Sequence, residues 1–338
     1  MEYTHVSQIN FSENINHRVY GIFLAQDVDV RTQSDGETKF ITLNMVDHEF
    51  KMDAKKFGAT EQEIQLMKTG KVYYAAIDVK LYKNKPSCVI YNFDEYTHEP
   101  ASNFISWADG MQEAYQLINE TLGYISGTIY KNIVTALIMD NWQKFSVWAA
   151  ASGMHHNLPG GLLVHTAEVI KQARSIADTW NSHYGEKFIN LPLLVSACLI
   201  HDIAKIHELA VDTSIGTVEY SKDSALETHI TMCVSMLEIE AYKQKFGYQT
   251  DDKSEETMLK EKEALKLLKH CILAHHGKKE YGSPIDMNCP EAYILHTADT
   301  LSAEMYRYNR NFKTMEPGSM NAVWLGGNIC VTYKGTEK

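Results

Sequence analysis

Seven histidine and aspartate residues stand at helix-like positions in otherwise apolar stretches of this chain. They are His165, His201, Asp202, His229, His275, His276 and Asp299. Burying such groups without partners would cost on the order of several kcal/mol. A shared metal removes that cost, because neutral imidazole and carboxylate are good ligands for divalent first-row metals. The pattern therefore indicates a metal-dependent hydrolase built on a helical domain.

The spacing of nearby apolar residues turns two of these side chains inward. His165 follows Leu162 by three residues and precedes Val169 by four, which places all three on one face of a helix. Asp299 follows Leu295 by four residues in the same way. A single histidine in such a place is more often a hydrogen-bonded core residue than a ligand. The complete set on successive helices favours one shared metal site.

Residues 17–97 predict a β-rich domain ahead of this site. They alternate between apolar and polar residues, with turns at 47–48 and 83–86. Residues 59–70 predict one short helix that ends at Gly70. Strands, a helix and two more strands predict a five-stranded barrel of the OB type. An irregular β-domain with a structural role is the alternative.

From about residue 101 to about residue 311 the pattern is helical, so the fold class is α+β. Residues 191–209 are apolar nearly all round and predict a buried, central helix. The expected divisions are a barrel domain over 1–100, a helical domain over 101–311 and a C-terminal extension over 312–338 that adds a short strand or a tail.

Composition excludes several classes of protein. The 338 residues are too many for one small core, so two domains are expected. The net charge of −11 argues against a general polyanion binder. It does not argue against a narrow channel that binds one strand or a nucleotide, in which metal ions supply positive charge. The sequence contains no apolar run of about 18 residues and no signal peptide, so we expect a cytoplasmic protein without membrane association. Six scattered cysteines indicate reduced thiols. The sequence does not decide whether the protein forms a homo-oligomer.

The order His…His-Asp…Asp resembles the HD superfamily of metal-dependent phosphohydrolases, which assigns residues 101–311 to an HD-type domain. The resemblance implies that His165, His201, Asp202 and Asp299 bind one metal. It also implies that His229 and one or both of His275 and His276 bind a second, with Asp202 bridging the two ions. Manganese is favoured, and iron, magnesium, nickel or zinc could occupy the same ligands.

The resemblance implies three catalytic residues, which are Asp202, Lys205 and His156. Lys205 in HDIAK matches a family lysine that faces the substrate phosphate; a surface lysine is the other interpretation. His155 and His156 precede the Gly160-Gly161 turn, where the family also has histidines. We expect His156 to steady a phosphate oxygen, and a satisfied loop histidine is the alternative.

Longer stretches narrow the resemblance. HHNLPGGLLVHTAEV, THITM, LKHCILAHHGKKEYGSP and EAYILHTADTLSAEM, in this order and after a barrel, are similar to the YhaM-type 3′→5′ exoribonucleases over residues 15–310. Thr228 and Ala204 depart from glycines that are usual in the family. The resemblance implies a metal-activated water that releases 5′-nucleotides from single-stranded RNA, and DNA is a second candidate substrate. A phosphohydrolase of small or cyclic nucleotides and a non-catalytic binding protein are the alternatives.

The barrel supplies candidates for binding a single strand, because OB barrels use aromatic platforms and basic loops. Lys80, Tyr82, Lys83 and Lys85 lie around the last predicted hairpin. Phe40 and Phe50 on earlier strands are further candidates, although strand aromatics are more commonly core. Residues 1–100 hold 11 Lys and Arg against 15 Asp and Glu, a net of −4, which is weak for tight nucleic-acid binding. Nucleic-acid binding by this domain stays open.

Overall fold

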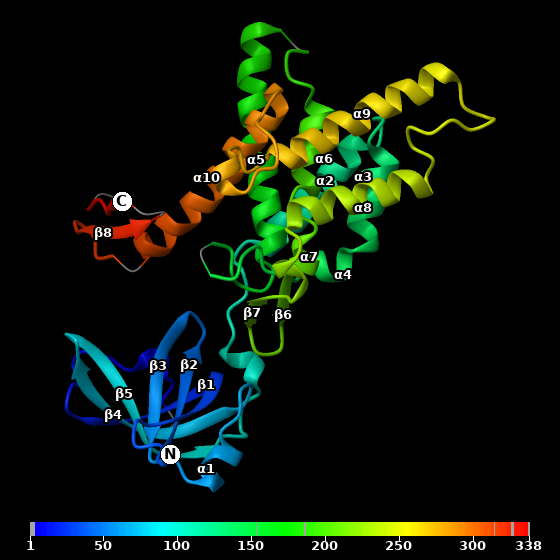
Figure 1. Cartoon of the computed structure of the whole chain (residues 1–338). Coiled ribbons are helices and arrows are strands. Elements are labelled where there is room, and N and C mark those ends of the chain that lie inside the picture. The colour runs from blue at the N-terminus through cyan, green and yellow to red at the C-terminus, as the bar shows by residue number, and fades with distance from the viewer. Residues whose placement is uncertain (1–3, 154, 186, 314, 326–327, 337–338) are drawn as a thin grey trace. The chain divides into compact units, whose positions relative to one another are not determined.

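The structure, a computed structural model, describes residues 4–153, 155–185, 187–313, 315–325 and 328–336. The chain divides into two compact units (Figure 1). The first comprises Met1–Ser106 together with Asp212–Thr217, and the second comprises Trp107–Val211 and Val218–Lys338. Within the described residues no helix is both long and apolar enough to cross a membrane.

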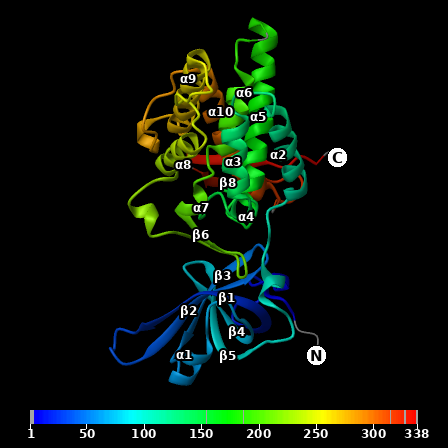
Figure 2. The ribbon, with the colours of Figure 1, turned by 90° about the vertical axis from the view of Figure 1, so that its right-hand side faces the viewer.

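The first unit is a closed five-stranded barrel (Figure 2). Strand order around the barrel is β1-β2-β3-β5-β4, with β1 pairing antiparallel to β4 and β3 pairing parallel to β5. Helix α1 lies between β3 and β4 in the sequence. This topology is that of an OB fold, so the predicted barrel is confirmed. The elements are β1 (Arg18–Thr32), β2 (Lys39–Asp47), β3 (Phe50–Phe57), α1 (Glu61–Leu66), β4 (Val72–Tyr82) and β5 (Lys85–Glu95).

Local sequence determines two of the barrel's connections. Thr60 and Glu63 form a reciprocal capping box that starts α1. Lys83 and Asn84 both have positive φ, 50° and 61°, which is the conformation of a two-residue type I′ hairpin. The turn is therefore shorter than the four residues predicted, and Lys85 and Pro86 already belong to β5.

The second unit is helical and is built around α6. Residues 193–200 of α6 are all buried, and the helix packs against α3, α5, α9 and α10. One continuous apolar core runs through these helices. The helices are α2 (Met111–Ile125), α3 (Lys131–Asp140), α4 (Trp142–Phe145), α5 (Gly161–Tyr184), α6 (Leu191–Ile200), α7 (Lys205–Glu208), α8 (His229–Lys243), α9 (Glu255–Ala274) and α10 (Pro290–Lys313).

The helix predicted over 191–209 does not continue to its expected end. Helix α6 stops at Ile200, and the following residues form tighter turns, in which the N–H of Ile203 bonds the carbonyl of Ile200 and the N–H of Lys205 bonds that of Asp202. Two hairpins complete the second half of the chain, β6 (Leu209–Asp212) with β7 (Thr217–Tyr220) and β8 (Met320–Leu325) with β9 (Asn328–Tyr333). The second hairpin occupies the tail where the sequence predicts a short strand.

Candidate metal centre

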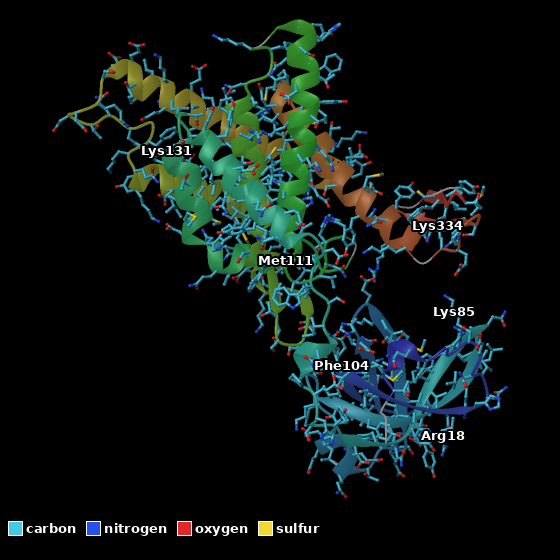
Figure 3. All side chains as sticks on the ribbon, turned by 180° about the vertical axis from the view of Figure 1, so that it is seen from behind. Arg18, Lys85, Phe104, Met111, Lys131 and Lys334 are labelled. Atoms are coloured by element: carbon cyan, nitrogen blue, oxygen red, sulfur yellow. The ribbon has the colours of Figure 1, made fainter. Side chains whose placement is uncertain are left out.

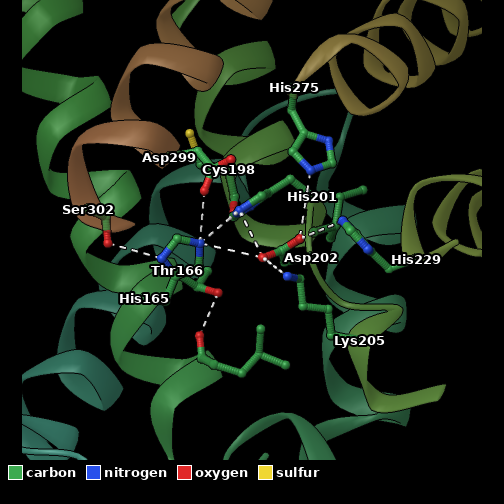
Figure 4. A network of polar contacts seen from close by, with 12 residues as sticks. His165, Thr166, Cys198, His201, Asp202, Lys205, His229, His275, Asp299 and Ser302 are labelled. Atoms are coloured by element: carbon green, nitrogen blue, oxygen red, sulfur yellow. Dashed lines mark hydrogen bonds and ion pairs between the residues drawn. The ribbon is translucent and has the colours of Figure 1, made fainter. Parts of the chain in front are cut away.

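The seven predicted histidines and aspartates come together in the helical unit. Figure 4 shows this cluster and labels all of its members except His276. Helix α5 contributes His165, the turn after α6 contributes His201 and Asp202, and α10 contributes Asp299. His229 is the first residue of α8, while His275 and His276 directly follow α9. His165, His201, Asp202, His229 and His275 are buried. His201 and Asp202 therefore directly follow the end of α6 at Ile200.

One group of these atoms surrounds Oδ2 of Asp202. Nε2 of His165 lies 3.1 Å from Oδ1 of Asp299, 3.4 Å from Oδ2 of Asp202 and 3.4 Å from Nε2 of His201. Nε2 of His201 lies 3.6 Å from the same Oδ2. Ligands that each lie about 2.1 Å from a tetrahedral metal are about 3.4 Å apart. These separations match the edges of a coordination shell.

A second group faces the other oxygen of Asp202. Oδ1 of Asp202 lies 3.3 Å from Nε2 of His229 and 3.7 Å from Nε2 of His275. His276 joins these two histidines in a set whose ligand atoms all lie within 4.8 Å of one another. The two oxygens of one carboxylate thus face two separate sets of histidines.

The remaining nitrogen of each histidine is held by a hydrogen-bond acceptor. Because carbonyl and carboxylate oxygens only accept, the histidine Nδ1 must carry a proton, which leaves Nε2 as the nitrogen that can ligate a metal. His165 follows the same rule, because Ser302 gives its one hydroxyl proton to Glu168 and must accept from His165. The Nδ1 partners are Ser302 Oγ for His165 (3.0 Å), Cys198 O for His201 (2.9 Å), Glu208 Oε1 for His229 (2.9 Å), Ile272 O for His275 (2.6 Å) and Tyr281 O for His276 (2.9 Å).

The donor set fits a divalent metal. Oδ1 of Asp202 and the Nε2 atoms of His229 and His275 are buried and make no hydrogen bond. Buried polar atoms are nearly always hydrogen-bonded, so several unpartnered acceptors aimed at one another call for a cation. Neutral imidazole with carboxylate suits divalent first-row metals, as the sequence predicts.

Electrostatics at the centre are dominated by burial and by the two aspartates. Burial opposes the charged form of His165, but hydrogen bonds with Asp202 and Asp299 outweigh it and raise the pKa of His165 to about 9. Burial lowers the pKa of His201 and of His275, so both are neutral. Burial opposes the charge of Asp202, but the ammonium of Lys205 and a hydrogen bond from His165 hold the pKa of Asp202 well below its usual range.

Metal binding should therefore release about one proton near neutral pH. The metal-free protein holds a proton on His165 up to about pH 9, and this proton must leave before Nε2 can ligate. We expect the affinity for Mn²⁺ to rise about tenfold per pH unit between pH 7 and pH 8 and to level off above pH 9. Calorimetry in two buffers of different ionisation enthalpy measures the proton count, and a pH-independent affinity without proton release would contradict the expectation.

Lys205 lies inside the centre and not on the protein surface. It is 9% exposed, and its Nζ lies 3.5 Å from Oδ2 of Asp202. Burial opposes the charge of its ammonium group, but Asp202 and Glu208 outweigh burial and raise the pKa of Lys205. A charged donor is thus fixed beside the carboxylate.

His156 lies next to His165 in a tightly constrained loop. It is 1% exposed, has a positive φ of 44°, and its ring centroid is 4.3 Å from that of Tyr306. Neither ring nitrogen makes a hydrogen bond, although Nε2 lies 3.3 Å from Oε2 of Glu168. A Cβ on Gly161 would lie 2.1 Å from the carbonyl oxygen of His156, so only glycine permits this approach. Strain of this kind concentrates at functional sites.

Three residues that orient the histidines were not predicted from the sequence. Glu208 holds His229, while Ser302 and Glu168 hold His165. The Ser302 and Glu208 contacts join residues 137 and 21 positions apart. Glu208 stands only three residues after Lys205, which is the one local signal that it belongs to the site.

The predicted barrel residues are exposed at one hairpin. Lys80, Lys83 and Lys85 are exposed, Tyr82 is 64% exposed, and Nζ of Lys83 lies 5.4 Å from the Tyr82 ring centroid. Lys85 and Arg18 project from the barrel surface (Figure 3).

The two phenylalanine candidates have different surroundings. Phe50 is partly buried, packs against the barrel core and stacks on Phe11. Phe40 stacks on Phe57 at 5.7 Å between ring centroids, and Phe57 is 47% exposed. Phe40 is half-buried, so the two rings form a partly exposed aromatic pair, of which only Phe40 was predicted as a candidate.

Comparison with known proteins defines the class of the helical unit. A family model of the HD domain matches residues 162–304, a span that contains all seven residues of the centre. The helical unit thus carries an HD domain, and the predicted resemblance is confirmed. The matched span begins at the start of α5 and ends within α10.

Over most of its length the chain is similar to curated exoribonucleases. It is 26% identical to the 3'-5' exoribonuclease YhaM of Bacillus subtilis over 82% of this chain and 83% of that protein. It is 25% identical to the protein of the same name from Bacillus velezensis, covering 90% of each chain. The corresponding protein of Oceanobacillus iheyensis is 24% identical over 88% of each chain. The resemblance to the YhaM type is therefore confirmed, at low identity.

Proposed function

We propose that this protein is a metal-dependent 3′→5′ exoribonuclease that removes 5′-nucleotides from single-stranded RNA. The observation that carries the proposal is the centre in which the Nε2 atoms of five histidines and the carboxylate of Asp299 converge around Asp202, whose Oδ1 is buried without a hydrogen-bond partner. The substrate class is supported by the relatives, which are named 3'-5' exoribonucleases and match both the barrel and the HD domain.

The arrangement supports two metal ions, with Mn²⁺ favoured. We assign His165, His201, Asp299 and Oδ2 of Asp202 to one ion. We assign His229, His275, His276 and Oδ1 of Asp202 to the other. Iron, magnesium, nickel and zinc accept the same nitrogen and oxygen donors, so metal analysis of the purified protein decides the identity.

The residues around the ions have separate tasks. Divalent ions at this centre would supply a bound water of lowered pKa and positive charge for phosphate oxygens. Lys205 keeps its charge and donates to a non-bridging phosphate oxygen. His156 is neutral, because burial lowers its pKa, and we assign it an uncharged N–H contact to the phosphate path. Ser302 and Glu168 hold His165 in the ligating orientation.

One assay separates this function from its alternatives. End-labelled single-stranded RNA with Mn²⁺ should give a ladder of shortening products that ends in 5′-nucleotides. Phosphate or nucleoside release from a nucleotide panel, with RNA left intact, would indicate a small-nucleotide phosphohydrolase instead. No bound or bindable divalent ion in the purified protein would indicate a non-catalytic binding protein.

We assign strand binding to the exposed hairpin of the barrel. Replacing Tyr82 and Lys83 together with alanine should raise KM for a 20-nucleotide RNA by about 10- to 100-fold, because base stacking on one aromatic ring contributes about 1–3 kcal/mol. The cleavage rate at saturating RNA should stay unchanged, and the salt dependence of binding should become shallower. Lys68→Ala, an exposed lysine elsewhere on the barrel, is the matched control. An unchanged KM in the double variant would contradict this assignment.

A further inference from the structure

Glu208 holds both the backbone and the side chain of one candidate metal ligand. It is the last residue of α7 and is 9% exposed. Its Oε1 accepts a hydrogen bond from the backbone N–H of His229 at 3.0 Å and another from Nδ1 of His229 at 2.9 Å. Its Oε2 also lies 2.9 Å from Nδ1. One buried carboxylate therefore fixes the position of the His229 backbone and the orientation of the His229 ring.

The backbone contact takes the place of a helix cap. His229 is the first residue of α8, and Thr228 at the capping position makes no side-chain capping bond. The N-terminal N–H groups of a helix have no partner within the helix, and a negative charge there is favourable. Glu208 satisfies one of these groups from a distant part of the chain, so it sets the position of the first turn of α8.

The side-chain contact aims the ring at Asp202. With Nδ1–H bonded to Glu208, the Nε2 lone pair of His229 lies 3.3 Å from Oδ1 of Asp202. Both atoms are buried without another hydrogen-bond partner. Any ion between them would depend on this orientation, because the other tautomer would point an N–H at the ion.

Within the described part of the chain, His229 is the one histidine of the five in the centre whose Nδ1 bonds a carboxylate directly. His201, His275 and His276 bond carbonyl oxygens three to five residues away in their own segments. His165 bonds a neutral hydroxyl. Those short-range carbonyl contacts come with the local backbone, whereas the His229 contact exists only when α7 and α8 are in place. A carboxylate partner also makes the imidazole a stronger ligand.

We propose that Glu208 is the positioning residue that controls occupancy of the metal position formed by His229, His275, His276 and Oδ1 of Asp202. The proposal rests on the two-metal centre of the proposed function. It predicts that loss of Glu208 weakens one ion selectively and leaves the ion of His165, His201 and Asp299 in place.

Manganese binding to the full-length protein tests this assignment. Calorimetric titration and elemental analysis should give two ions for the wild type. Glu208→Ala should keep one site at wild-type affinity and weaken the other about 10- to 100-fold. Glu208→Gln should be milder, because the amide oxygen can still accept both hydrogen bonds without the charge. Glu240→Gln is the matched control, since Glu240 is a buried glutamate of α8 that bonds Gln244 and Lys243.

A double variant separates ring positioning from helix capping. Adding Thr228→Asn to Glu208→Ala supplies a good capping residue but no partner for Nδ1 of His229. If Glu208 positions the ring, the double variant should still lack the second ion. Recovery of that ion would show that capping alone mattered and would overturn the assignment.

Two further outcomes contradict the proposal in distinguishable ways. Unchanged affinity at both sites of Glu208→Ala, or equal weakening of both, overturns the role of Glu208 while the two-metal centre stands. A wild-type protein that binds no Mn²⁺ or only one ion overturns the two-metal centre itself.

Discussion

Replacing Asp202 with alanine should remove both metal ions and lower the rate of RNA hydrolysis by at least about a thousandfold. Oδ2 of Asp202 lies within 3.6 Å of both His165 and His201, and Oδ1 lies 3.3 Å from His229. No other carboxylate among the described residues of the centre faces both histidine sets. Loss of the metal ions removes several kcal/mol of transition-state stabilisation, so the activation free energy rises by that amount. Each 1.36 kcal/mol corresponds to about tenfold in rate.

The Asp202 prediction needs metal content, turnover and folding measured on one preparation. Elemental analysis, release of 5′-nucleotides from labelled RNA and a circular-dichroism melt supply the three values. Asp178→Ala, which removes an exposed aspartate of α5, should change none of them. A folded Asp202→Ala protein that still hydrolyses RNA, or that still binds both metal ions, would contradict the bridging role.

Replacing Lys205 with alanine should lower kcat about 100- to 1000-fold while both metal ions stay bound. The loss corresponds to removing one preorganised donor that stabilises charge on the transferring phosphate. Nζ lies 3.5 Å from Oδ2 of Asp202, and the raised pKa of Lys205 keeps the group charged at neutral pH. Without this cation the affinity for Mn²⁺ should be unchanged or higher, because a like charge has left the centre.

Comparing kcat with metal content distinguishes the proposed task of Lys205 from a structural one. Lys205→Arg keeps the charge and should recover part of the rate, although its planar donor group does not match an ammonium. Lys266→Ala, an exposed lysine of α9, is the control. If Lys205 only neutralised Asp202 for folding, its loss would lower metal content or thermal stability and leave the kcat of the loaded protein unchanged.

Residue types and their apolar surroundings in the sequence were sufficient to predict which histidines and aspartates come together, because these groups are costly to bury in apolar helices unless a shared metal binds them. His165 and Asp299 lie on inward helix faces as the spacing of Leu162 and Leu295 predicts. The barrel could also be predicted, because alternating apolar and polar residues indicate strands. One helix between β3 and β4 is typical of an OB fold. These signals are local or periodic, and a sequence displays them directly.

The contacts that orient the centre could not be predicted in the same way. Glu208 contacts His229 although the β6–β7 hairpin separates them in the sequence, and Ser302 contacts His165 from α10. Such contacts depend on packing between segments, for which sequence periodicity gives no signal. The break of the helix at Ile200 could not be predicted because the apolar pattern continues past it. Phe57 was missed because its partner Phe40 lies on another strand.

Anomalous X-ray diffraction from crystals grown with Mn²⁺, collected at the manganese absorption edge, tests the central claim most directly. We predict two anomalous peaks, one on each side of the Asp202 carboxylate. The first should lie among His165, His201 and Asp299, and the second among His229, His275 and His276. A fully folded centre with no anomalous peak, or with peaks that Asp202 does not touch, would contradict the two-metal account of this protein.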